Sequence, residues 1–459
     1  MISTEKTTLY AGVLPNSEMI PTHDSTECRT YKKRWFVLAL FVLYSMSNSM
    51  QWIEYSIIAN VVQKYYQVPN SYIDWTSMIY MVTYIPFIFP ASWLIDKLGL
   101  RVAVILGAFG TCGGAWIKVL SVGQDRFYVT FLGQSVVALS QIFVLSVPAP
   151  LAATWFGPNE VSSACSIGVF GNQLGIAIGF LIPPILVKNS EVMESIGAGL
   201  STLFYSVAIL TSVLLVLILI FFQGKPPLPP SPAQAVPAQA VQRNAESVPF
   251  ATSIKHLATN PAYVLLLVSY GINVGVFYAI STLLNQIFVA HFPGKEEDAG
   301  RIGLMIVVAG MLGSVCCGIV LDKTHKFKET TLGVYFFSLV GMVVYTFTLG
   351  SGFIAVVYIT ASLLGFFMTG YLPVGFELAA ELTYPEPEGT SAGLLNAGAQ
   401  VFGIFFTMFS SYVLNTYGDL WANIMLCCAL VVGTGLTALI RSDLRRQAAH
   451  AKAPPLPGP

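Results

Sequence analysis

The sequence predicts an all-α membrane protein with twelve transmembrane helices in two six-helix halves. Of its 459 residues, 55% are hydrophobic and only 10% are charged, which is too little polar surface for a soluble protein of this size. Apolar segments recur that are long enough to cross a hydrocarbon core of ~30 Å. The first set lies at about 35–62, 72–95, 102–122, 127–150, 160–187 and 199–222, and the second at about 262–290, 300–321, 331–350, 353–378, 390–415 and 420–440.

The first apolar segment begins at Trp35, after a polar stretch that ends in Lys32, Lys33 and Arg34. A secretory signal peptide would place a short apolar region early, followed by a small-residue cleavage site. This segment is longer than such a region, so we expect it to remain in the mature protein as the first transmembrane helix.

A proline-rich stretch, KPPLPPSPAQ after Gly224, separates the two sets of segments. Proline at this density prevents regular helix and sheet, so we expect a flexible or extended linker. Its last part, from Phe250 to His256, is mildly amphipathic and is expected to lie on the membrane surface. The predicted organisation is an N-terminal tail at 1–34, a first half at 35–222, a linker at 223–261, a second half at 262–442 and a C-terminal tail at 443–459, which we expect to be disordered after Arg446.

The distribution of Lys and Arg predicts the orientation in the membrane. If both termini are cytoplasmic, all but six of the 23 Lys and Arg residues lie on the cytoplasmic side of the membrane. This agrees with the excess of basic residues that cytoplasmic loops carry, and an even number of spans requires both termini on one side. The six basic residues assigned to the outer side are Lys64, Lys118, Arg126, Lys188, Lys295 and Arg301.

Several functional classes are excluded by the composition and by missing motifs. The formal net charge is zero, so nothing indicates a nucleic-acid partner. Six of the seven cysteines lie in apolar segments without a CxxC pair, so we expect neither disulfides nor a metal site. A membrane enzyme is disfavoured because the chain has no histidine cluster and no HExxH motif. No cofactor is expected.

Two copies of one short pattern occur at equivalent places in the two halves. Residues 92–101 read SWLIDKLGLR, and residues 318–326 read GIVLDKTHK. Both resemble the major facilitator loop pattern G-x-L-x-D-[RK]-x-G-[RK]-[RK], from which they depart at Ser92, Leu100 and His325. A duplicated transporter requires such a recurrence. The resemblance therefore implies the major facilitator fold.

The charged residues of these copies are candidates for a cytoplasmic gate. A carboxylate at a helix end can pair with basic residues and neighbouring helix termini, and so hold the gate shut until the two halves rock. The alternative is that these are solvated loop charges that only fix the topology. The candidate gating residues are Asp96, Arg101, Asp322 and Lys323.

Longer stretches identify a closer resemblance. They are YSMSNSMQWIEY at 44–55, FGNQLGIAIGF at 170–180, FYAISTLLNQ at 277–286, MTGYLP at 368–373, ELTYP at 381–385 and GTSAGLLNAGAQ at 389–400. These stretches resemble the feline leukaemia virus subgroup C receptor family of transporters, and the resemblance runs from about Arg34 to Arg446. The family usually carries glutamine where this chain has Glu54.

This resemblance implies facilitated transport of choline, and also of ethanolamine, by a monomer in the lipid bilayer. An older attribution of haem transport in the family leaves a haem or other organic-ion carrier as the alternative. The plasma membrane is the expected location, with mitochondrial and endoplasmic reticulum membranes as alternatives. The positions that correspond to the family's choline pocket are Trp52, Gln141, Tyr278 and Gln400, with Asn48 and Met81 nearby.

The chemistry of choline agrees with these residue types. A trimethylammonium group has no N–H donor, so an aromatic face recognises it better than a carboxylate does. Trp52 lies well inside the first segment, and its i, i+4, i+7 spacing with Asn48 and Tyr55 predicts one shared helix face. Trp52 and Tyr278 could instead be ordinary packing residues.

The amides of Gln141 and Gln400 lie deep in apolar spans, where an unpaired polar group is costly. They are expected to bond the hydroxyl of choline, and the alternative is a hydrogen bond between helices. Gln173 lies in a glycine-rich stretch and is expected to pack helices rather than to contact substrate.

We assign few acidic residues to the membrane interior, namely Glu54, Glu377 and Glu381, and no histidine is central to a span. Proton-coupled transporters usually need a relay of such groups, so their scarcity favours a uniporter. It also disfavours haem as cargo, because no buried histidine is present as an axial ligand. Glu54 is interpreted as structural, with ion coupling as the alternative.

Overall fold

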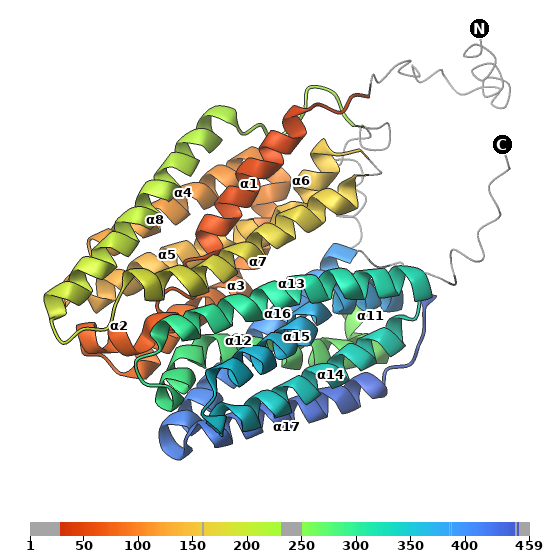
Figure 1. Cartoon of the computed structure of the whole chain (residues 1–459). Helices are drawn as coiled ribbons and strands as arrows, with labels where there is room; N and C mark the ends of the chain where they lie inside the picture. Colours follow the sequence, from red (N-terminus) through yellow and green to blue (C-terminus); the bar gives the residue numbers. More distant parts are fainter. Residues whose placement is uncertain are drawn as a thin grey trace, which may run out of the picture.

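The computed structural model describes residues 28–157, 160–230, 250–384, 386, 388–445 and 448. Two bundles of long helices lie side by side, the first coloured red to yellow-green and the second green to blue (Figure 1). Residues 231–249 of the predicted linker, and most of both predicted tails, lie outside the described residues.

The first half contains six long helices and three short elements. The long helices are α1 (Lys33–Ser49), α3 (Asn70–Leu98), α4 (Leu100–Val119), α5 (Phe127–Ser146), α7 (Val161–Leu186) and α8 (Met193–Phe221). The short elements are the 3-10 turn η1 (Ser56–Ile58), α2 (Ala59–Tyr66) and α6 (Pro148–Trp155).

The second half repeats the arrangement of six long helices. These are α12 (Pro261–His291), α13 (Glu296–Thr324), α14 (Phe327–Thr348), α15 (Ile354–Thr383), α16 (Glu388–Tyr417) and α17 (Asp419–Ala438), with the 3-10 turn η2 (Leu349–Ser351) after α14. Each long helix coincides with one predicted apolar segment.

Eleven of the helices in the described part of the chain are long and apolar enough to cross a membrane. The remaining predicted span, the first one in the chain at 35–62, is not one continuous helix. It divides into α1, an irregular stretch from Met50 to Tyr55, η1 and α2. Large apolar side chains such as Phe109, Ile220 and Leu312 are at least 60% exposed, which suits helix surfaces that face lipid.

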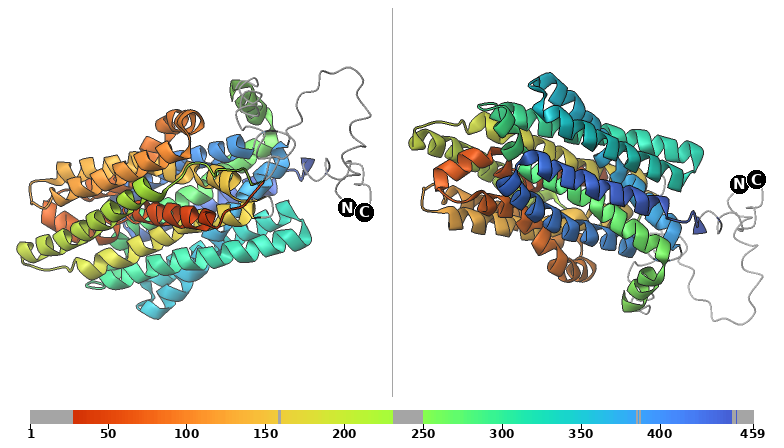
Figure 2. Two further views of the ribbon diagram at one scale, coloured as in Figure 1. Left: turned by 90° about the horizontal axis from the view of Figure 1, so that it is seen from above. Right: turned by 90° about the horizontal axis from the view of Figure 1, so that it is seen from below.

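The bundle has two ends, which we name by the chain. The terminal end is where α1 begins and α17 finishes, and the distal end is where α2 and the α7–α8 and α12–α13 connections lie. The predicted amphipathic segment forms a helix at the terminal end, α11 (Phe250–Thr259). This helix lies outside the two bundles (Figure 2). It buries Leu257 and exposes Lys255, and His256 bonds Glu386 over 2.9 Å.

Candidate functional site

The break in the first span sets the geometry of the site. The amide nitrogen of Gln134, on α5, donates to the backbone carbonyls of Gln51 and Thr76, each over 2.9 Å. A polar side chain that takes the place of helix hydrogen bonds allows an irregular backbone inside a membrane protein, where each peptide group needs a partner. The expectation that Asn48, Trp52 and Tyr55 share one helix face is therefore wrong, because α1 ends at Ser49.

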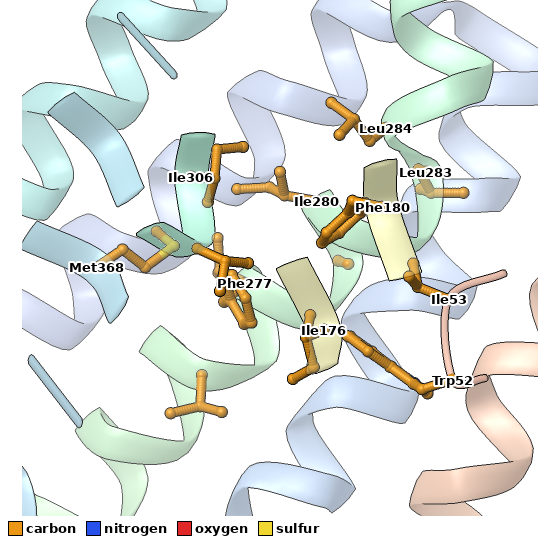
Figure 3. Close-up of a cluster of buried hydrophobic side chains, with 14 of the residues drawn as sticks. Trp52, Ile53, Ile176, Phe180, Phe277, Ile280, Leu283, Leu284, Ile306 and Met368 are labelled. Atoms are coloured by element: carbon orange, nitrogen blue, oxygen red, sulfur yellow. The ribbon is translucent and has the colours of Figure 1, made fainter. Parts of the chain in front are cut away.

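Trp52 extends from this irregular stretch toward the second half of the protein. Its side chain is 4% exposed, and its indole nitrogen donates to the carbonyl of Ser77, on α3, over 3.3 Å. The ring meets that of Tyr278, on α12, edge to face, with centroids 5.7 Å apart and planes at 71°. Figure 3 shows Trp52 directed toward Ile176 of α7, with Phe277 of α12 farther along the same cluster. The two halves thus meet through an aromatic pair.

A small cavity of about 60 Å³ lies at this contact. It gathers five of the six residues that the sequence assigned to substrate binding, which come from four helices and the irregular stretch. These lining residues are Trp52, Met81, Gln141, Tyr278 and Gln400.

The cavity combines aromatic faces with amide and hydroxyl groups. The side-chain nitrogen of Gln400 donates to the hydroxyl of Tyr278 over 3.4 Å. Tyr80 and Gln173 also line the cavity, and neither the Tyr80 hydroxyl nor the Gln173 carbonyl oxygen has a hydrogen-bond partner among the described residues. The interpretation of Gln173 as only a packing residue is therefore incomplete. Such a lining can bind an organic cation that also carries a hydroxyl group.

Asn48 lies away from this cavity, contrary to expectation. Its side-chain nitrogen donates to the hydroxyl of Thr111 over 2.9 Å and to the carbonyl of Val137 over 3.2 Å. These bonds join α1 to α4 and α5, so Asn48 holds helices together inside the first half.

Lys118, which the prediction assigned to the outer side, is buried among the helices of the first half. It lies in the last turn of α4, and its side chain is 1% exposed. Its ammonium group pairs with the carboxylate of Glu54 over 2.8 Å. The prediction placed it outside because it stands close to the end of an apolar segment, and the sequence gives no sign of its partner.

Asp74, in the first turns of α3, is a buried acid that the sequence reasoning missed. One carboxylate oxygen accepts a bond of 2.7 Å from Gln286, on α12, and the other a bond of 2.6 Å from Ser411, on α16. It lies near the start of the predicted span at 72–95, where the sequence analysis assigned it no role. The structure instead places Asp74 between the halves.

Further polar contacts join the halves at the distal end. The backbone N–H of Asn60, on α2, donates to the side-chain oxygen of Asn285 over 3.2 Å, and the side-chain nitrogen of Asn60 donates to the carboxylate of Glu296 over 2.9 Å. Ser77 and Thr282 share a hydrogen bond of 2.8 Å, and Lys188 pairs with Glu297. In this conformation the two halves are fastened together at the distal end.

The candidate gating residues lie at the terminal end, within helix ends rather than in long loops. Asp96 is in the last turn of α3, and Asp322 and Lys323 are in the last turn of α13. Arg101 is in the first turn of α4 and donates to the carbonyl of Leu219, at the end of α8, over 2.9 Å. All four side chains are exposed.

The two copies of the repeated pattern share a backbone feature. In the first copy Gly99 follows the end of α3 with φ +88°, and in the second copy His325 holds the equivalent position after α13 with φ +52°. Both helices therefore turn at a residue with positive φ, although only the first copy has the glycine that the pattern specifies.

Comparisons with known proteins agree with this fold and with the resemblance of the sequence. Residues 37–361 match the model of the Major Facilitator Superfamily. The choline/ethanolamine transporter flvcr2b of Danio rerio is 54% identical over 94% of this chain and 88% of its own length. The choline/ethanolamine transporter FLVCR2 of Homo sapiens is 50% identical over 93% of this chain and 81% of its own. A bacterial homologue of the human lysosomal transporter Spinster, solved in an inward-facing and occupied conformation, superposes with a TM-score of 0.66 at 12% identity, covering 93% of this chain and all of that one.

Proposed function

Because this chain belongs to the feline leukaemia virus subgroup C receptor family of major facilitator transporters, a family of multi-pass membrane transporters and not of enzymes, we propose that it carries choline and ethanolamine across a membrane. The observation that supports this most is the cavity between the halves. It brings the rings of Trp52 and Tyr278 together with the amides of Gln141 and Gln400. The relatives named above are transporters of the same two amines.

The proposed binding mode divides the substrate between two kinds of group. The rings of Trp52 and Tyr278 attract the ammonium group, and an aromatic face contributes about 2 kcal/mol when water is excluded. The amides of Gln141 and Gln400 bond the hydroxyl group, which choline and ethanolamine share. Met81, whose thioether is soft and apolar, packs against the methyl groups.

Alternating access is the proposed mechanism. The contacts of Asp74 and Asn60 fasten the distal end in the conformation described here, and these contacts must open for substrate to reach the cavity from that side. We assign Asp96, Arg101, Asp322 and Lys323 to a latch at the terminal end that forms when the distal end opens. The residue pattern recurs in both halves, as a latch between two related bundles requires.

The transport is proposed to be uniport. Choline is a permanent cation, and an interior-negative potential favours its entry by ~2.3 kcal/mol per 100 mV, which drives accumulation without a second ion. Glu54, the acid considered for ion coupling, is engaged with Lys118. We propose a monomer in the plasma membrane with both termini in the cytoplasm, and localisation with a fluorescent fusion separates this from mitochondrial or endoplasmic reticulum membranes.

Uptake of labelled choline into proteoliposomes tests the proposal, with membrane potential and pH gradient imposed separately. Accumulation that follows the potential and is competed by unlabelled ethanolamine is the expected result. Accumulation driven by a proton gradient at zero potential contradicts uniport. Failure to take up either amine, together with uptake of haem, would establish the alternative cargo.

A further inference from the structure

A buried ion pair lies behind Trp52 and has no part in the cavity lining described above. Glu54 and Lys118 are 2.8 Å apart, with side chains 2% and 1% exposed. The ammonium group of Lys118 also donates to the side-chain oxygen of Gln51 over 3.0 Å, and it lies 5.4 Å from the centre of the Tyr55 ring. A fully buried ammonium group is thus surrounded by three groups from one short stretch of chain.

This stretch is the irregular one that carries Trp52. Gln51 and Glu54 stand on either side of Trp52 in sequence, and both are directed to Lys118 on α4, inside the first half. Trp52 itself is directed to Tyr278 in the second half. The stretch is therefore anchored on one side and presents an aromatic ring on the other.

An anchor is needed here because the stretch lacks the hydrogen bonds of a continuous helix. Gln134 holds the carbonyl groups of Gln51 and Thr76, but a single amide leaves the direction of the Trp52 side chain to other contacts. The pair of Glu54 and Lys118 supplies a second anchor. Since its charges cancel, it does so without placing a net positive charge near a site for a cation.

We propose that Glu54 and Lys118 form a positioning pair that fixes Trp52 at the cavity and keeps the wall behind it electrically neutral. The inference rests on the proposed function for its effect on substrate, but its effect on the backbone is independent of any substrate. Glu54 and Lys118 are positioning residues, because both act through Trp52.

Removing one charge tests the pair through transport. Glu54→Gln leaves the ammonium group uncompensated, which repels a cation and releases the stretch, so KM for choline should rise by about tenfold or more while Vmax per folded molecule changes less. Lys118→Met leaves the carboxylate unpaired and should also raise KM by releasing the stretch. The double variant Glu54→Gln with Lys118→Gln restores neutrality and a hydrogen bond, and its KM should return to within about threefold of the wild type.

A matched control is the exposed ion pair in the same half. Lys64 and Glu191 lie 3.3 Å apart with side chains 29% and 98% exposed, so Lys64→Gln should change neither KM nor the backbone. If the single-variant proteins are not expressed, the test uses the conservative variant Glu54→Asp and the neutral double variant. Both must then keep a KM for choline close to that of the wild type.

Hydrogen exchange of the substrate-free protein gives the readout that is independent of transport. Peptides covering residues 50–55 should exchange faster in Glu54→Gln than in the wild type and should regain protection in the double variant, while peptides from α12 stay unchanged. If the wild type transports neither amine, the proposed function fails and the exchange result still decides the positioning role. Unchanged exchange and unchanged KM in Glu54→Gln, or a double variant as impaired as the single, would overturn the inference.

Discussion

Asp74 of α3 accepts a hydrogen bond of 2.7 Å from Gln286 of α12, and so a carboxylate of the first half is joined to an amide of the second. The carboxylate is 2% exposed, and its other oxygen is bonded by Ser411 over 2.6 Å. A hydrogen bond to a charged group contributes about 1.5–3 kcal/mol. This contact is therefore strong enough to influence which end of the transporter is open.

Asp74→Leu should shift the protein toward conformations open at the distal end. A loss of about 2 kcal/mol changes the ratio of closed to open molecules roughly thirtyfold. The measurement is the distance between spin labels at the exposed positions Val192 and Lys295, in the two distal connections, in a cysteine-free background. Ser411→Ala, which removes one of the two bonds, should give a smaller shift. An unchanged distance distribution in Asp74→Leu would show that the other distal contacts suffice.

Trp52→Ala should abolish most choline uptake while expression stays near normal, because the change removes an aromatic face of the cavity. A loss of about 2 kcal/mol corresponds to roughly thirtyfold weaker binding. Trp52→Phe should retain part of the activity, since a weaker aromatic face remains. The measurement is initial uptake per molecule at the membrane. Wild-type uptake by both variants would exclude Trp52 as the ammonium site.

Gly403→Ala should weaken choline binding although Gly403 is not itself a lining residue. A Cβ atom there would lie 2.7 Å from a ring carbon of Tyr278 and 2.9 Å from the sulfur of Met81, so both lining side chains would have to move. Gly435 on α17 is the matched control, since a Cβ atom there meets nothing within 4 Å. Equilibrium binding of labelled choline to both purified variants makes the comparison. Equal affinities for choline in the two variants would contradict the prediction, because they would show that movement of Tyr278 and Met81 does not affect binding.

Asp96→Asn and Asp322→Asn should slow turnover more than they weaken binding at equilibrium. Both residues lie at helix ends of the terminal end, away from the cavity, so they bear on the proposed rocking of the halves. Glu329→Gln, an exposed acid in the first turn of α14 outside the repeated pattern, is the control. Uptake rates compared with binding of labelled choline separate the two effects. Weaker binding with normal turnover of the bound fraction would argue against the latch.

Gly99→Ala should destabilise the protein by about 1–3 kcal/mol, and His325→Ala by less than about 1 kcal/mol. Gly99 has φ +88° and ψ 174°, a conformation that is essentially restricted to glycine, whereas His325 has φ +52° and ψ 22°, which other residues adopt at lower cost. A Cβ atom at Gly99 would meet nothing within 4 Å, so the cost is conformational and not steric crowding. Thermal unfolding in detergent measures both variants. Equal midpoints would contradict this assignment of strain.

The sequence predicted the helices well because length and apolar composition determine which segments cross a bilayer. The repeated pattern predicted the two related halves, and the family resemblance led to five of the residues that line the cavity. The break at Met50 was beyond prediction, since it depends on Gln134, an amide some eighty residues away in the chain. The burial of Asp74 and of Lys118 was missed for the same reason. Each stands near the end of an apolar segment, and only tertiary contacts reveal its buried partner.

The pair of Glu54 and Lys118 also has a consequence for biosynthesis. The first apolar segment of this sequence carries an acid whose basic partner follows 64 residues later. Until α4 has been inserted, this carboxylate faces either lipid or the aqueous pore of the translocation machinery, and a charge in lipid is costly. The first segment must therefore wait beside the insertion site, or enter the bilayer with its carboxylate protonated, until three spans have been made. The first segment therefore reaches its final place in the bilayer only after α4 has been inserted, and substitutions at Lys118 would delay that step.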